Sequence, residues 1–159
     1  MIYYPRHPQA KHDPVKRWNR PERVFFAAGA CHILAYAFLE RFPERMGKAI
    51  WIRPRDGSPN NHIFVSLGEC AFDYHGYCDQ ARLLDHFARR VRTRFPDWSP
   101  EFIELPADAL ISEAKSKTYP GLWLREPGQF LYDALPRARA FLNRFEHSLK
   151  GSPGPHRTT

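Results

Sequence analysis

Apolar residues recur at every third or fourth position in two stretches of the chain, and each stretch predicts an amphipathic helix. The first runs from Cys31 to Phe42 and stops there because Pro43 disfavours helical geometry in the residue before it. The second runs from Asp79 to Phe95 and keeps its arginines off the apolar face. Two further helices are expected towards the C-terminus, over residues 107–117 and 130–149.

Between the helices, short runs of β-favouring residues, some with alternating apolar and polar positions, predict strands. The expected strands are 48–53, 61–67, 70–75 and 102–105. A turn at Asp56-Gly57-Ser58-Pro59 separates the first two. This order of elements indicates an α+β domain with a small antiparallel sheet, spanning residues 23–150.

The two ends of the chain lack this periodicity. Residues 1–22 hold four of the fifteen prolines, interspersed with Lys, Arg and His, and are expected to form an extended basic arm. Residues 151–159 combine Gly, Pro and Ser with no apolar residue, which is the composition of a disordered tail. The whole chain has 159 residues, 43% of them hydrophobic, which suits a single domain with its own core.

The dipeptide Gly68-Glu69 predicts how the second and third strands pair. Gly at the first central position favours a type II′ hairpin turn, and this turn fixes the register. The predicted cross-strand pairs are Leu67–Cys70, Val65–Phe72, Phe64–Asp73 and His62–His75. Asp73 then lies diagonal to His62 and within side-chain reach of it. The polar face carries His62, Phe64, Asp73 and His75, and the apolar face carries Ile63, Val65, Leu67, Phe72 and Tyr74.

The candidate chemistry is a thiol, an imidazole and a carboxylate in that order along the chain. Cys31 stands in the first turn of a predicted helix, where unpaired N–H groups and the helix dipole favour the thiolate. His62 is the candidate base, and a buried Asp73 that accepts its Nδ1–H would orient it. His75 is the alternative third member. Asn61 points to the other face of its strand and is a poor third member.

This arrangement resembles the papain-like cysteine hydrolase superfamily in its compact bacterial, NlpC/P60-like forms. The resemblance rests on Gly29-Ala30-Cys31-His32-Ile33-Leu34-Ala35 before a helix and on His62-Ile63-Phe64-Val65, with Asp73 and Gly76 beyond it. It covers residues 24 to about 77, a third of the chain. Where NlpC/P60 enzymes usually have a histidine as the third residue, this chain offers an aspartate.

The resemblance implies a papain-like core in which the cysteine-bearing helix packs on the sheet, with additional C-terminal helices. It also implies that Cys31 is the nucleophile, His62 the base and Asp73 the residue that orients His62. The expected activity is that of a thiol hydrolase or acyltransferase acting on an amide, isopeptide or thioester bond of a protein, peptide or other amide-containing substrate. Neither a cofactor nor a metal is expected.

A formal net charge of +7 favours acidic partners. Part of this charge lies on the second long helix, at Arg82, Arg89, Arg90, Arg92 and Arg94. These arginines support a second hypothesis, a non-catalytic papain-like module that docks on nucleic acid or an acidic protein. Arginines on the outer face of an amphipathic helix are more often simply solvated, and no nucleic-acid motif accompanies them.

Three cysteines cannot all pair with one another, which favours reduced thiols and a cytoplasmic location. No apolar run approaches the roughly 20 residues needed to span a bilayer, and the N-terminus lacks the apolar core of an export signal, so no membrane partner is expected. Cys70, His75 and Cys78 could instead begin a zinc site, completed by Cys31, His32 or His62. That alternative is the weaker one, since Cys70 and His75 would point to opposite faces of a regular strand.

Overall fold

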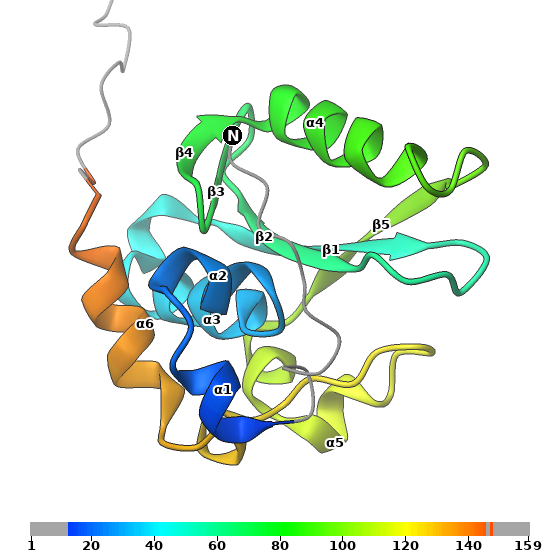
Figure 1. Ribbon diagram of the computed structural model, residues 1–159. Helices are drawn as coiled ribbons and strands as arrows, with labels where there is room; N and C mark the ends of the chain where they lie inside the picture. Colours follow the sequence, from blue (N-terminus) through cyan, green and yellow to red (C-terminus); the bar gives the residue numbers. More distant parts are fainter. Residues whose placement is uncertain (1–12, 146, 148–159) are drawn as a thin grey trace, which may run out of the picture.

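The computed structural model describes residues 13–145 and residue 147. They form an α+β fold around one five-stranded antiparallel sheet of order β4-β3-β2-β1-β5, which confirms the predicted class (Figure 1). The strands are β1 (Lys48–Pro54), β2 (His62–Ser66), β3 (Cys70–Asp73), β4 (Gly76–Asp79) and β5 (Pro100–Leu105). The α-helices are α1 (Pro14–Trp18), α2 (Glu22–Ala27), α3 (Cys31–Arg41), α4 (Gln80–Arg92), α5 (Glu113–Ser116) and α6 (Ala134–Leu142). Short 3-10 helices are η2 (Pro43–Arg45), η3 (Ala107–Ile111) and η4 (Pro127–Gln129).

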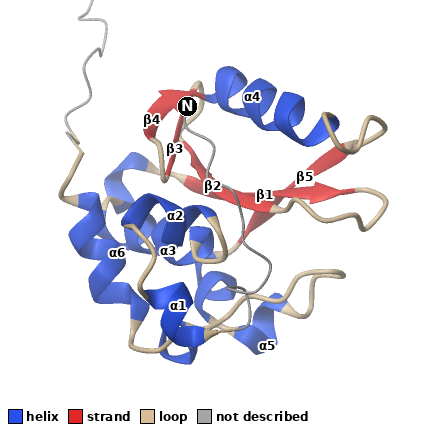
Figure 2. Cartoon of the chain, in the orientation of Figure 1, coloured by secondary structure: helices blue, strands red, loops and turns tan. Residues whose placement is uncertain are grey.

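The helices cover the two faces of the sheet unequally (Figure 2). Helix α4 packs on one face through its buried stripe Leu83, Phe87 and Val91, as its 3.6-residue period predicts. Helices α2, α3 and α6 lie on the opposite face, with α3 between the sheet and α6. Because α3 is covered on several sides, it is apolar nearly all round. Its Phe38 stacks on Phe72 of β3 with ring centroids 4.7 Å apart, which ties the helix to the sheet.

The Gly68-Glu69 hairpin has the predicted register as far as Val65. Val65 pairs with Phe72, and the Leu67 N–H donates to the Cys70 carbonyl at 2.8 Å. Gly68 has φ +90°, as the first central position of a type II′ turn requires. The two faces also divide as predicted, with Ile63, Val65, Phe72 and Tyr74 in the α3 layer and Phe64 in the α4 layer.

The observed third strand is shorter than the predicted strand 70–75, so His75 lies outside it. Strand β3 ends at Asp73, and a tight turn through Tyr74 and His75 leads directly into β4, where Asp73 pairs with Gly76. Asp73 closes this turn by accepting the His75 backbone N–H on Oδ1 at 2.8 Å, the usual way that an aspartate competes with strand pairing. His75 therefore lies in a turn, not across the sheet from His62.

The turn depends on Gly76, which has φ +98°. A Cβ atom on Gly76 would lie 2.7 Å and 2.8 Å from two ring carbons of Phe145. That ring has little room to move, since it packs edge-on against Phe72 and Phe141 at centroid distances of 5.4 and 5.2 Å.

We therefore expect Gly76→Ala to lower the free energy of unfolding by roughly 2 to 4 kcal/mol, from backbone strain plus overpacking. Urea denaturation would measure the loss. Gly57→Ala is the matched control, because Gly57 also has a positive φ of +71° but has nothing within 4 Å of its added Cβ. Equal losses in the two variants would show that the Phe145 contact contributes nothing.

The helices predicted near the ends of the chain differ from those observed. The prediction that residues 1–22 are extended is wrong for 14–18, which form α1. Asp13 caps this helix by accepting the Val15 and Lys16 N–H groups at 3.0 and 3.1 Å. The predicted helix 107–117 is split into η3 and α5, because Ser112 caps α5 at Lys115 N with a 3.2 Å bond.

The predicted closing helix, 130–149, is shorter than expected. Its observed counterpart, α6, begins only after the Asp133 cap and ends at Leu142. Pro136 fits within its first turn, where an N–H has no intrahelical partner. The predictions for residues 1–12 and 151–159 concern residues outside the described part of the chain.

Candidate active site

Cys31 is the first residue of α3, as predicted. The Ala30 carbonyl accepts hydrogen bonds from both Ile33 N and Leu34 N, at 3.1 and 3.3 Å, and so starts the helix. The N–H groups of Cys31 and His32 belong to the first turn, which has no intrahelical acceptors for them. The Cys31 thiol thus lies beside backbone donors and the positive end of the helix dipole.

His62 is held at the start of β2, at the end of the sheet. It pairs with Ile52 of β1, and its ring is stacked on Phe87 of α4 with centroids 5.6 Å apart and planes 16° apart. The Tyr74 ring meets its edge at 5.7 Å. Only 4% of His62 is exposed, so its imidazole has a fixed orientation.

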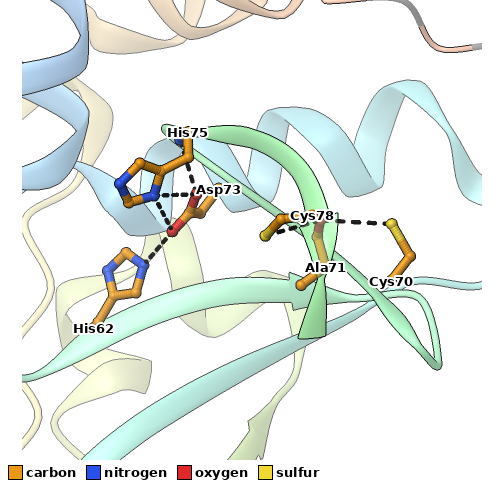
Figure 3. Close-up of polar contacts among 6 residues, drawn as sticks. All are labelled: His62, Cys70, Ala71, Asp73, His75 and Cys78. Atoms are coloured by element: carbon orange, nitrogen blue, oxygen red, sulfur yellow. Dashed lines mark hydrogen bonds and ion pairs between the residues drawn. The ribbon is translucent and has the colours of Figure 1, made fainter. Parts of the chain in front are cut away.

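Asp73 binds His62 from the neighbouring strand (Figure 3). His62 Nε2 lies 3.0 Å from Asp73 Oδ2, and because a carboxylate only accepts, Nε2 carries the proton of this bond. The expectation that Asp73 would accept from Nδ1 is therefore wrong. The bond to Nε2 leaves Nδ1 for the interaction with Cys31.

His75 binds the other side of the same carboxylate. His75 Nδ1 lies 3.1 Å from Asp73 Oδ1, so Asp73 stands between two imidazoles, as Figure 3 shows. His75 is thus next to Asp73 and is not an alternative partner of His62. Burial alone would raise the pKa of the Asp73 carboxyl, but the hydrogen bonds and positive charges of His62 and His75 outweigh it and hold that pKa well below its usual range.

The electrostatics of Cys31 and His62 favour a charged pair. Burial alone would raise the pKa of the Cys31 thiol, but interactions with the imidazoles of His32 and His62 lower it to about 5. Burial alone would lower the pKa of His62, whereas hydrogen bonds with Asp73 and Cys31 and their negative charges raise it to about 9. Between these two pH values the site holds a thiolate beside an imidazolium.

A cleft with a volume of about 530 Å³ gives access to both residues. Its walls come from the N-terminus of α3, the start of β2 and the coil at 121–125. The lining residues are Arg17, Ala27, Gly29, Cys31, His32, Trp51, Pro59, Asn60, Asn61, His62, Ile63, Gly121, Leu122, Trp123, Leu124 and Arg125. A substrate in this cleft would lie against the thiol and the imidazole together.

Sequence reasoning missed the part of this cleft contributed by His32 and the 121–125 coil. His32 is buried, and its Nε2–H donates to the Arg125 carbonyl at 2.7 Å, which fixes the coil beside the residue that follows Cys31. Trp123 is 58% exposed at this wall. Asn61, set aside as a third member, accepts the indole N–H of Trp51 at 2.9 Å and so holds another wall residue.

The other two thiols lie elsewhere. Cys70 and Cys78 on β3 and β4 both point to the Ala71 carbonyl, with sulfur–oxygen distances of 3.7 and 3.9 Å, while His75 turns to Asp73 (Figure 3). Burial raises the pKa of Cys78 to about 12. Within residues 13–145 and 147, no group of three or more His, Cys, Asp or Glu side chains could hold a metal ion.

The arginines of α4 are only partly available to a partner. Arg89 pairs with Asp85 at 2.9 Å, Arg92 Nε donates to the Trp98 carbonyl at 3.1 Å, and the guanidinium of Arg90 lies over the Phe87 ring. Arg82 on α4 and Arg94, which lies just beyond its C-terminal end, are exposed.

Comparisons with family models, with curated proteins and with solved structures each found no match to this chain. In the described part of the chain, no helix is both long enough and apolar enough to cross a membrane.

Proposed function

We propose that the protein is a thiol hydrolase or acyltransferase with Cys31 as nucleophile, His62 as general acid–base and Asp73 as the residue that orients His62. One observation carries the proposal. Cys31, at a helix N-terminus, and His62, bonded to a buried Asp73 at 3.0 Å, line the same cleft. Carboxylate, imidazole and thiol in that relation form the set that nucleophilic acyl transfer requires.

The chemistry follows from these positions. The Cys31 thiolate attacks the carbonyl carbon of an amide, isopeptide or thioester, forming an S–C bond while the carbonyl electrons move to oxygen. The first-turn N–H groups of α3 are donors for that oxyanion. When the intermediate collapses, the bond to the leaving group breaks and the His62 imidazolium gives that group its proton. Water, or an acceptor nucleophile, then gives a proton to His62 and attacks the thioester, releasing the acyl product and the thiolate.

The proposal is tested by the pH dependence of iodoacetamide labelling of the native protein, with each modified cysteine located by mass spectrometry. Because the pKa of Cys31 is lowered to about 5, its labelling rate should rise through about pH 5 and be nearly level at pH 7. Cys78 is an internal control, since burial raises its pKa to about 12. It should stay unlabelled over this range.

The result against the proposal would be labelling of Cys31 that rises only near the pKa of an ordinary thiol, about 8.5. That outcome would favour the non-catalytic module, which docks on nucleic acid or an acidic protein through its arginines. Such docking would weaken steeply with added salt, whereas labelling of a thiolate would not.

A further inference from the structure

The described residues that line the cleft include no carboxylate. Of the described residues around it, Arg17 and Arg125 are permanently cationic, His62 is held as an imidazolium, and none is Asp or Glu. A cleft whose charged side chains are mainly cationic attracts ligands of negative charge. The thiolate of Cys31 is balanced by His62, and the guanidinium of Arg125 adds positive charge to the cleft.

Arg125 differs from several other arginines of this chain in the groups that it contacts. Elsewhere Arg53, Arg137 and Arg139 each pair with a glutamate. In the described part of the chain no carboxylate pairs with Arg125. Its guanidinium lies instead over the rings of Trp123 and Phe130, at 6.0 and 5.4 Å from their centroids. A guanidinium whose neighbours are aromatic rings and not carboxylates keeps its N–H donors for a planar anion.

A hydrogen bond sets the position of the Arg125 backbone relative to the nucleophile. Its carbonyl accepts the His32 Nε2–H at 2.7 Å, and His32 directly follows Cys31. The same coil carries the exposed Trp123. Because Cys31, Trp123 and Arg125 line one cleft, a substrate whose carbonyl is at Cys31 shares that cleft with an aromatic ring and a guanidinium.

Building on the thiol chemistry proposed above, we propose that the substrate carries a carboxylate close to the bond that Cys31 attacks, and that Arg125 recognises this carboxylate. Trp123 would cover the apolar part of the same group. The substrate class is thus an acidic amide or thioester. Examples are an amide or thioester of a dicarboxylic acid whose other carboxylate is free, and a peptide with an acidic side chain next to the bond that is cleaved.

Two alkylating reagents of nearly equal size test this inference. Iodoacetate and iodoacetamide react with Cys31 in the same way: the thiolate sulfur forms a bond to the CH₂ carbon, the C–I bond breaks, and iodide leaves. Only iodoacetate carries a carboxylate, so the ratio of the two rates at pH 6 measures anion preference at the thiol. The His62 imidazolium also attracts iodoacetate, and the informative quantity is therefore the change in the ratio when Arg125 is replaced.

We expect Arg125→Gln to lower the iodoacetate-to-iodoacetamide ratio by roughly three- to tenfold, the order of effect of removing one charge from a partly screened cleft. The iodoacetamide rate should stay within about twofold of that of the wild type. Arg125→Lys keeps the charge and should retain most of the preference. Arg89→Gln is the matched control, because it changes the net charge equally but removes an exposed charge of α4 that does not line the cleft.

The outcomes separate this inference from the proposed function. Slow reaction of wild-type Cys31 with both reagents would overturn the thiol chemistry and, with it, the substrate assignment. Fast iodoacetamide labelling with a ratio unchanged in Arg125→Gln would overturn only the assignment of an acidic substrate. If Arg125→Gln does not fold, Arg125→Met removes the same charge while keeping an apolar side chain against Trp123 and Phe130, and the same comparison decides.

Discussion

Replacing His62 with alanine should reduce the turnover of p-nitrophenyl acetate, a small activated acyl donor, by roughly 10³-fold or more. Two effects contribute. General acid–base catalysis by a positioned imidazole supplies about 10²- to 10⁴-fold, and the thiolate also loses the cation that helps to lower its pKa to about 5. The rate of p-nitrophenolate release measures the loss, and the midpoint of iodoacetamide labelling of Cys31 should move to higher pH in the same variant.

The pH midpoint makes this test specific for the pair. A merely structural role of His62 would reduce turnover through unfolding and leave the labelling of all three cysteines faster, not slower. His86→Ala is the control, because it removes an imidazole of α4 that lies outside the cleft. Cys31→Ala should abolish turnover with little change in stability. Turnover that survives Cys31→Ala would contradict the proposed function.

Replacing Asp73 with asparagine should lower the free energy of unfolding by roughly 3 kcal/mol or more at pH 6. Removing one partner of a buried charged group leaves the others unpaired, which typically costs about 3 to 5 kcal/mol. Asp73 is 4% exposed and has two imidazoles and one backbone N–H on its oxygens. Urea denaturation measures the loss, and turnover should fall as well because His62 is no longer oriented.

The pH dependence of this loss follows from the signs of the shifts. The pKa of Asp73 is depressed in the folded protein, so its contribution is present above its unfolded value of about 4 and is lost as the pH falls further. The pKa of His62 is raised to about 9, so its contribution is present below its unfolded value of about 6.5 and is lost as the pH rises through about 9. The difference in the free energy of unfolding between wild type and Asp73→Asn should therefore be largest between about pH 4 and 6.5.

A control separates burial from the ion pair itself. Asp108 also pairs with a cation, Lys115 at 2.6 Å, but both side chains are exposed. Asp108→Asn should change the free energy of unfolding little at any of these pH values. If Asp73→Asn lowers the free energy of unfolding as little as Asp108→Asn does, the buried network does not stabilise the fold.

The parts of the site that the sequence could predict are those governed by local rules. A glycine at the first position of a two-residue turn fixes the register of β2 and β3, and with it the distance from His62 to Asp73. The helix that begins at Cys31 follows from its apolar spacing and from Pro43. Each of these signals lies within a few residues of the element that it determines.

The remaining parts depend on contacts between residues far apart in the sequence. The 121–125 coil has no periodicity, and it is held by His32 through Arg125 and by the Ser116 hydroxyl, which accepts the Leu124 N–H at 3.0 Å. The N-terminal segment is held by Arg137, which donates to the Arg20 carbonyl at 2.7 Å and to Glu22 at 2.6 Å. No local sequence pattern predicts such long-range contacts. His75 was misplaced because the choice between continuing a strand and turning at Asp73 depends on one aspartate hydrogen bond.

The hairpin register also sets which changes in chain length the site can survive during evolution. Side chains alternate faces along a strand, so one residue inserted between His62 and Asp73 would send the carboxylate to the α3 layer and remove it from the imidazole. Two inserted residues, one in each strand beside the Gly68-Glu69 turn, would lengthen the hairpin and keep His62 and Asp73 on the same face of the sheet. The 55–60 connection before His62 carries no such constraint on parity, so divergent descendants of this chain should vary in length there while keeping the spacing from His62 to Asp73.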